Sequence, residues 1–131
     1  MTAKGRVLVV DDAVVMRMMI KDILSKNGFE IAGEAQNGAD AIEKYKSLRP
    51  DIVTMDMVMP GMDGVSAVKG IIAEDPAAKI VMCTSMGQDA LLKEAMDAGA
   101  KTRITKPFRP SEILEVIGKV LDGVEAGPER S

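Results

Sequence analysis

The stretch DIVTMDMVMPGMDG, residues 51–64, combines an apolar run, an acidic residue and two turn-forming pairs. The apolar run predicts a strand over Asp51–Met55 that is buried on both faces, because a half-exposed strand would alternate polar and apolar residues. Pro60-Gly61 predicts a turn, and Asp63-Gly64 precedes a stripe of apolar residues at helical spacing. Asp56 is therefore expected directly after a buried strand, where the chain turns toward a helix.

The same strand-then-helix unit occurs five times along the chain. The other strands are expected at Arg6–Val10, Glu30–Ala35, Lys79–Cys83 and Thr102–Thr105. A helical pattern of apolar residues follows each strand. The first of these stretches ends at Asn27-Gly28, the second covers Ala39–Leu48, and the third follows Gly64. The fourth runs from Asp89 to about Ala98, and the fifth begins at Pro110. Repeated units of this kind indicate an α/β fold with a parallel sheet and helices on both faces.

Strand composition predicts the order of the sheet. The first, third and fourth strands are nearly all apolar and should be central, whereas the second and fifth contain polar residues and should lie at the edges. The predicted order is 2-1-3-4-5, a flavodoxin-like (βα)5 doubly wound sheet. In such a sheet ligands bind at the carboxyl ends of the strands on either side of the switch point, here strands one and three.

Length and composition restrict the function further. The 131 residues suit one domain, which we place at 1–122, followed by a flexible tail at 123–131. The net charge of −3 and the 2% aromatic content argue against nucleic-acid binding. No apolar run is long enough for a membrane span, and the single Cys83 suits the cytoplasm. With no histidine, His-dependent nucleophiles and His-ligated zinc are excluded; the eleven methionines are interpreted mostly as core residues.

Polar residues follow the strands at the predicted binding edge. They are Asp11-Asp12, Asp56, Thr84-Ser85 and Lys106-Pro107. Each taken singly has an ordinary structural explanation as a helix cap, a turn residue or a solvated charge. Together, three carboxylates at one edge require compensating positive charge, which Lys106 and a bound Mg²⁺ would supply. An aspartate in such a site can act as a nucleophile toward phosphorus.

The segments VLVVDD, DIVTMDMVMPGMDG, VMCTS and KPF resemble the receiver domains of bacterial two-component response regulators, over Arg6 to about Leu121. The resemblance implies that Asp56 is phosphorylated by a sensor histidine kinase. It also implies roles for the neighbouring residues: Asp12, Asp56 and the main-chain carbonyl of Val58 as Mg²⁺ ligands, Asp11 acting through coordinated water, Thr84 as the switch hydroxyl, Lys106 as the partner of the phosphoryl oxygens, and a cis peptide bond before Pro107.

Two segments resemble the chemotaxis branch of this family, namely the CheY type. They are Asp12-Ala13-Val14-Val15-Met16-Arg17 and Cys83-Thr84-Ser85-Met86-Gly87-Gln88. This resemblance implies a monomeric signalling protein rather than an enzyme, with a chemotaxis kinase upstream and the flagellar motor switch as target. A phosphorelay intermediate outside motility and a static binding protein are alternatives, as are a flavin-binding carrier and an aspartate-dependent phosphatase. The last two fit poorly, because the chain lacks stacking aromatic residues and an acid-x-acid motif after the first strand.

Three residues depart from or specialise the receiver pattern. Arg103 stands where the family has an aromatic residue three positions before the lysine. Arg103 either alters the switch surface or lies extended on an edge strand with little effect. Val58 and Met86 occupy the two positions that tune dephosphorylation in the family, and both are apolar. Neither side chain can orient an attacking water molecule, which predicts slow unassisted hydrolysis of the phosphorylated form.

Overall fold

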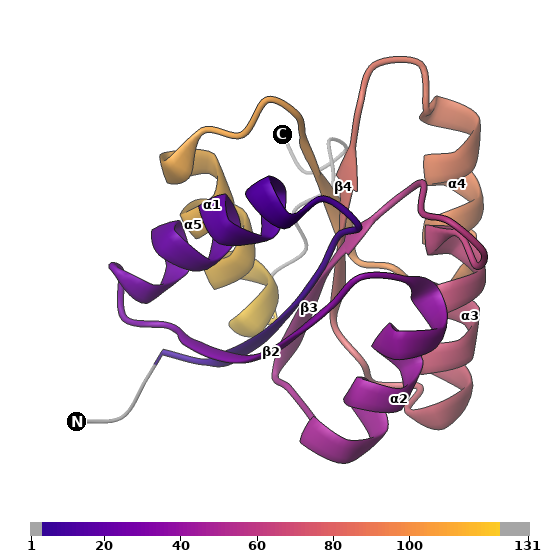
Figure 1. Ribbon diagram of the computed structural model, residues 1–131, viewed down its shortest axis with the longest axis horizontal. Helices are drawn as coiled ribbons and strands as arrows, with labels where there is room; N and C mark the ends of the chain where they lie inside the picture. Colours follow the sequence, from indigo (N-terminus) through magenta and orange to yellow (C-terminus); the bar gives the residue numbers. More distant parts are fainter. Residues whose placement is uncertain (1–3, 124–131) are drawn as a thin grey trace.

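A computed structural model of the chain describes residues 4–123, which form one five-stranded parallel sheet flanked by helices (Figure 1). The strands are β1 Arg6–Val10, β2 Glu30–Ala35, β3 Ile52–Asp56, β4 Ile80–Thr84 and β5 Thr102–Thr105. Their order is β2-β1-β3-β4-β5, and all neighbouring strands are parallel. The predicted fold class and strand order are confirmed, although β3 and β4 each begin and end one residue later than expected.

The helices form a layer on each face of the sheet. They are α1 Val14–Ser25, α2 Gly38–Leu48, α3 Gly64–Glu74, α4 Asp89–Ala98 and α5 Pro110–Leu121. Helices α1 and α5 cover one face, and α2, α3 and α4 cover the other (Figure 1). Side chains of Asn37 and Asp63 cap α2 and α3 by accepting hydrogen bonds from the backbone N–H groups of Asp40 and Ser66. These caps fix where α2 and α3 begin after the loops that follow β2 and β3.

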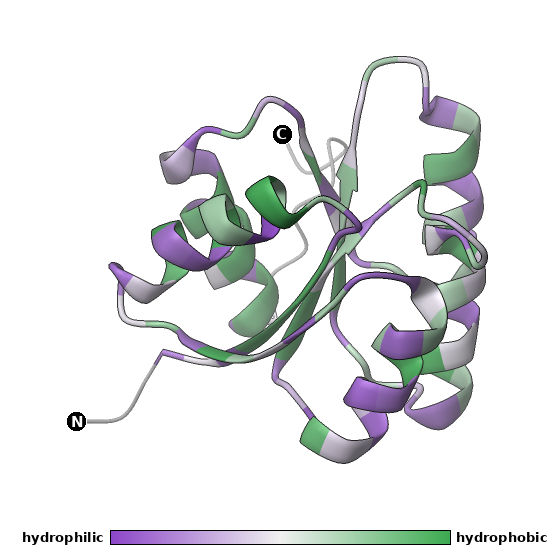
Figure 2. Ribbon diagram, in the orientation of Figure 1, coloured by the Kyte–Doolittle hydropathy of each residue, from purple (hydrophilic) through white to green (hydrophobic). Residues whose placement is uncertain are grey.

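Burial follows the predicted division into central and edge strands. All residues of β3 and β4 are buried, and β1 is buried from Val7 onward, whereas β2 is mostly half-exposed. In β5 the side chains alternate, with Thr102 and Ile104 buried and Arg103 and Thr105 exposed. Apolar residues accordingly concentrate along the middle of the sheet, as Figure 2 shows. Two hydrophobic cores result, one on each face.

The interpretation of the methionines as core residues is only partly right. Met55, Met57, Met59 and Met82 are buried, but Met18, Met19, Met86 and Met96 are exposed. Helical spacing predicts that Met16, Met19, Ile20, Ile23 and Leu24 share the inward face of α1, but only Ile20 and Leu24 are buried and Met19 is exposed. The first turns of α1 lie at the carboxyl edge of the sheet, beyond the strand residues against which the rest of the helix packs. Helical spacing likewise predicts that Leu121 faces inward on α5, but Leu121 is only partly buried and Val120 is buried instead.

The remaining expectations about the chain concern membranes and the tail. No helix within residues 4–123 has the length and apolar character needed to cross a membrane. The expected tail at 123–131 lies, apart from Gly123, outside the described residues.

Candidate functional site

The loop after β1 brings two carboxylates to the edge of the sheet. Asp11 is buried, with 1% of its surface exposed, whereas Asp12 is exposed. The Asp11 backbone N–H donates to the carbonyl of Ala35 at the end of β2, at 3.1 Å. The Asp11 carboxylate oxygen Oδ1 accepts a hydrogen bond from the Ala13 N–H at 2.9 Å. The Oδ1 atom of Asp11 thus stabilises the loop, and the Oδ2 atom does not take part in that hydrogen bond.

Asp56 is the last residue of β3, and only 6% of it is exposed. Its Oδ1 atom accepts hydrogen bonds from the Met57 N–H at 2.9 Å and from Lys106 Nζ at 3.1 Å. Helix α3 begins very close to this turn, because the Gly64 N–H donates to the Met57 carbonyl at 2.9 Å. A Cβ atom on Gly64 would lie 2.3 Å from the Asp56 carbonyl oxygen, so the turn requires glycine at that position.

Three carboxylates meet at this edge. One oxygen each from Asp11, Asp12 and Asp56 lies within 4.8 Å of the others. The Asp11 Oδ2 atom is buried and accepts no hydrogen bond from any residue in the range 4–123. A buried carboxylate oxygen without a partner is unfavourable unless positive charge is supplied. Hard divalent cations such as Mg²⁺ prefer carboxylate oxygens, so these residues fit the predicted Mg²⁺ site.

Lys106 supplies the permanent positive charge of the site. Its Nζ atom lies 3.1 Å from Asp56 Oδ1 and 3.7 Å from Asp11 Oδ2. Burial by itself would lower the pKa of the Lys106 ammonium group, but the hydrogen bond to Asp56 and the charges of both carboxylates raise it overall. Lys106 therefore remains a cation at neutral pH. Its backbone N–H donates to the Thr84 carbonyl at 2.7 Å, and its peptide bond to Pro107 is cis, as the resemblance implied.

The electrostatic balance leaves Asp56 short of positive charge. Burial raises the pKa of the Asp56 carboxyl group, and the nearby negative charge of Asp11 raises it further. The hydrogen bond and charge of Lys106 offset only part of this increase. The neighbouring thiol takes no part, because burial raises the pKa of Cys83 to about 12. The site is thus arranged to gain from a further cation beside its carboxylates.

Thr84 ends β4 at the same edge as Asp56. Thr84 is 3% exposed and pairs with Thr105 of β5, and in the adjacent ladder Asp56 pairs with Cys83. Thr84 is thus one residue beyond the β4 partner of Asp56. The prediction that the four strand ends lie at one edge of the sheet is therefore confirmed. The charged cluster at this edge consists of the three aspartates and Lys106.

Comparison with known proteins agrees with this geometry. A family model described as the response regulator receiver domain matches residues 7–118. The chain belongs to the response regulator receiver family. Its relatives include proteins named Chemotaxis protein CheY from Thermotoga maritima, 59% identical over 88% of this chain and 96% of that protein, and from Bacillus subtilis, 56% identical over 89% and 98%.

Solved receiver structures show the same fold. The structure of a CheX-CheY-BeF3-Mg complex from Borrelia burgdorferi superposes with a TM-score of 0.84 at 36% identity, covering 88% of this chain and 87% of that one. Members of this family are signalling proteins, so the receiver assignment replaces the flavin-carrier and phosphatase alternatives.

Four residues with proposed roles in dephosphorylation or in the switch surface are exposed around the carboxylates and β5. Val58 is 54% exposed and Met86 is 98% exposed, in the loops that follow Asp56 and Thr84. Arg103 and Pro107 are also exposed, on β5 and directly after Lys106. Arg103 lies on the exposed face of the edge strand β5, so its side chain can extend into solvent.

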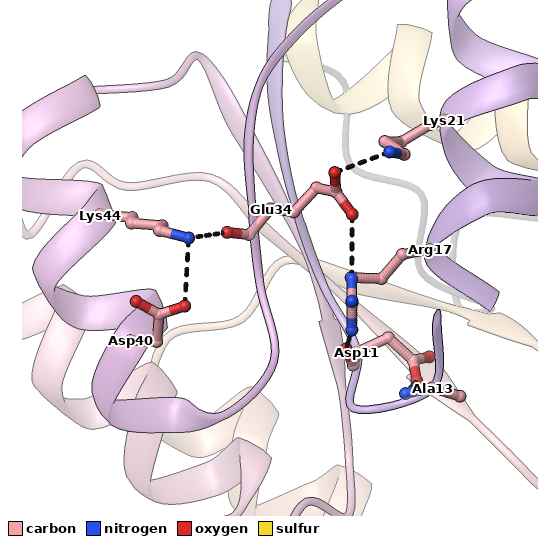
Figure 3. A network of polar contacts seen from close by, with 7 residues as sticks. All are labelled: Asp11, Ala13, Arg17, Lys21, Glu34, Asp40 and Lys44. Carbon is pink, nitrogen blue, oxygen red and sulfur yellow. Dashed lines mark hydrogen bonds and ion pairs between the residues drawn. The ribbon is translucent and has the colours of Figure 1, made fainter. Parts of the chain in front are cut away.

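Polar contacts that the sequence did not predict hold the loops of the site. Gln88 accepts a hydrogen bond from the Ser85 N–H at 2.7 Å and so braces the loop after Thr84. Arg17 and Glu34 form a second set of contacts behind Asp11 (Figure 3). For the Gln88 contact, the only signal in the sequence was a glutamine four residues beyond Thr84. No local feature of the sequence indicated the contacts of Arg17 and Glu34.

Proposed function

We propose that this chain is a chemotaxis response regulator that receives a phosphoryl group on Asp56 from a sensor histidine kinase. The observation that carries the proposal is the buried Asp56 carboxylate within 4.8 Å of two others and hydrogen-bonded to Lys106. The relatives named as chemotaxis proteins support the choice of pathway, since the chain covers nearly all of their length. The whole chain would then act as a switch that binds other proteins.

The chemistry of transfer follows from the position of Asp56. A carboxylate oxygen of Asp56 forms a bond to phosphorus as the bond from phosphorus to the kinase histidine nitrogen breaks. The imidazole leaves as the neutral ring after it takes up a proton. Little covalent chemistry is needed from the receiver beyond alignment and neutralisation of the phosphoryl oxygens. The Lys106 ammonium group, 3.1 Å from Asp56, is placed to contact those oxygens.

Magnesium fits the same residues. Asp11, Asp12 and Asp56, with the main-chain carbonyl of Val58, would hold the ion, with Asp11 acting through coordinated water. When bound, Mg²⁺ supplies positive charge that neutralises the carboxylates and the incoming phosphoryl group.

Signalling would follow from the charge that phosphorylation adds. The phosphoryl group of an aspartyl-phosphate carries about −1.5 to −2 charges in place of the single negative charge of the carboxylate, and we propose that the Thr84 hydroxyl and Lys106 close on its oxygens. Lys106 also joins the ends of β5 and β4 through its N–H to Thr84 bond, so its movement would be transmitted to β5. Beside it, a hollow of the surface lies between the end of β5 and the first turns of α5. It is lined by Thr105, Lys106, Pro107, Arg109, Ser111, Glu112 and Glu115.

The downstream partner is proposed to be the flagellar motor switch, which would contact α4, β5 and α5. This face includes Arg103 and Pro107, so an altered residue at position 103 would change partner specificity rather than phosphoryl uptake. Capture of partners with a stable phosphoryl mimic distinguishes this proposal from a phosphorelay intermediate, whose partner would be a histidine phosphotransfer protein.

A mass measurement tests the proposed chemistry. The protein is incubated with acetyl phosphate, which is a small phosphoryl donor, with Mg²⁺ or with excess chelator, and the intact protein is weighed. We expect a gain of one phosphoryl group with Mg²⁺ and none with chelator. No gain under either condition would contradict the proposal, and an equal gain with chelator would contradict the role of the metal.

The apolar side chains of Val58 and Met86 predict a long-lived phosphorylated form. Both lie exposed next to the site and neither offers a hydrogen bond to an attacking water molecule. The double substitution Val58→Asn with Met86→Gln is expected to speed the decay of the phosphorylated protein by about tenfold, because positioned polar groups assist such reactions. Decay is followed as loss of the phosphorylated mass with time. Rapid decay of the wild type, unchanged by the substitutions, would show the prediction to be wrong.

A further inference from the structure

Arg17 connects the acidic loop to the outer strand β2. Its Nη1 atom donates to the backbone carbonyl of Asp11 at 2.7 Å, and its Nε atom donates to Glu34 Oε1 at 2.9 Å (Figure 3). The other Glu34 oxygen accepts from Lys21 Nζ at 2.6 Å. The Arg17 side chain is only 13% exposed, so its guanidinium group is held between the loop and the strand.

The carbonyl that Arg17 contacts belongs to the peptide bond between the two acidic residues. A peptide unit is planar, so fixing the Asp11 carbonyl also fixes the direction of the Asp12 N–H group. Asp11 is further held through its own N–H and its Oδ1 atom. Asp12 is exposed, so its position depends on the orientation of this backbone.

Glu34 keeps the guanidinium group in place. The hydrogen bond from Lys21, and then that from Arg17, hold the pKa of the Glu34 carboxyl group below its usual value, so Glu34 is ionised at neutral pH. An ionised acceptor gives a strong, directional bond to the arginine Nε atom. Lys21 shares this carboxylate and lies on the same helix, but within residues 4–123 it forms neither a hydrogen bond nor an ion pair with Asp11.

We propose that Arg17 is a positioning residue for the metal-binding acid pair, and that Glu34 orients Arg17. The inference rests on the proposed function, in which the three aspartates bind Mg²⁺. It assigns to Arg17 a role through the backbone of Asp11 and not through contact with the metal or the phosphoryl group.

Charge and position predict opposite effects of removing Arg17. Removing a positive charge near three carboxylates would strengthen the binding of a divalent cation, by electrostatics alone. Releasing the Asp11–Asp12 peptide would weaken binding, because residues that orient metal ligands commonly contribute about 10- to 100-fold in affinity. The sign of the change therefore separates a positioning role from a charge effect.

The test is a calorimetric titration of the metal-free protein with Mg²⁺. For Arg17→Met we expect a dissociation constant at least about tenfold higher than that of the wild type. Lys21→Met is the matched control, since it removes the same charge from the same helix and the same Glu34 carboxylate. We expect Lys21→Met to bind Mg²⁺ with an affinity within about twofold of the wild type, or more tightly. Arg17→Lys, which retains one donor, should recover part of the affinity.

Two outcomes would overturn the inference: Mg²⁺ binding by Arg17→Met that equals or exceeds wild-type binding, or an equal loss in Lys21→Met. Thermal unfolding of each metal-free variant reports whether the fold is intact. If Arg17→Met does not fold, Glu34→Gln carries the test, with weaker Mg²⁺ binding expected and unchanged binding counting against the inference. A wild type that binds no Mg²⁺ would instead contradict the proposed function.

Discussion

Asp56→Asn is expected to abolish phosphoryl uptake from acetyl phosphate completely. The amide has no negative charge and is a poor nucleophile, yet it has nearly the shape of the carboxylate and can still accept the Met57 N–H bond. The fold should therefore persist while the chemistry is lost. Intact mass after incubation with acetyl phosphate and Mg²⁺ is the measurement. Asp51→Asn, at the opposite end of β3, is the matched control and should take up one phosphoryl group as the wild type does.

The same substitution is expected to stabilise the metal-free protein at neutral pH. Because the pKa of Asp56 is raised in the folded state, the folded protein binds more protons than the unfolded chain over the interval between the two pKa values. Stability therefore falls as pH rises from the unfolded value, about 3.9, through the folded one, and stays lower above it.

Replacing the carboxylate removes this penalty, and we expect a gain of about 1 kcal/mol in the free energy of unfolding at pH 7. Urea denaturation with chelator present measures it. A variant that takes up no phosphoryl group but is less stable than the wild type would contradict the account of Asp56 electrostatics.

Lys106→Met is the second substitution with a large expected effect. The ammonium group is the only side-chain cation of the described residues that contacts both Asp11 and Asp56. A donor fixed where charge develops in the transition state typically contributes about 10² to 10³ in rate. We expect the rate of phosphorylation by acetyl phosphate to fall by about this factor, with Mg²⁺ saturating.

The Lys106 prediction has two checks. Lys101→Met removes a lysine from the opposite end of β5, where Lys101 is exposed, and should leave the rate unchanged. Loss of Lys106 should also raise the pKa of Asp56 further, since Lys106, with a smaller effect from the Met57 N–H, opposes the effects of burial and Asp11. A phosphorylation rate within a few fold of the wild type would show that Lys106 merely compensates charge in the resting protein.

The order of the sheet was predictable because burial acts on whole strands. Strands with apolar side chains on both faces can only be central, and β1, β3 and β4 satisfied this condition. Their ends converge by topology, so the positions of Asp56, Thr84 and Lys106 at one edge followed without any coordinates. One-residue errors at β3 and β4 are within the usual uncertainty of strand ends, which depend on pairing rather than composition.

The contacts behind the acidic loop were not predictable in the same way. Glu34 pairs with Val9 only because the register of β1 and β2 shifts between Val7 and Leu8, which inserts an extra residue in β2. Register of this kind depends on the packed sheet, and the sequence pattern of a mixed edge strand does not specify it. The Arg17 side chain is only 13% exposed because of these contacts, which the sequence around it does not indicate.

The exposure of α1 also escaped sequence reasoning. Val14, Val15 and Met18 are apolar, yet they are between 58% and 70% exposed. Helical periodicity reports which residues share a face, but it does not report how far a helix extends past the sheet that it covers.

The most direct measurement is to locate the phosphoryl group on the chain. Borohydride reduces an aspartyl-phosphate to homoserine, a change that fragment masses assign to a single residue. After treatment with acetyl phosphate and Mg²⁺, the account predicts homoserine at position 56 and unchanged aspartate at positions 11 and 12. Homoserine at either of those two positions, or at none of the three, would contradict the claim that Asp56 is the acceptor.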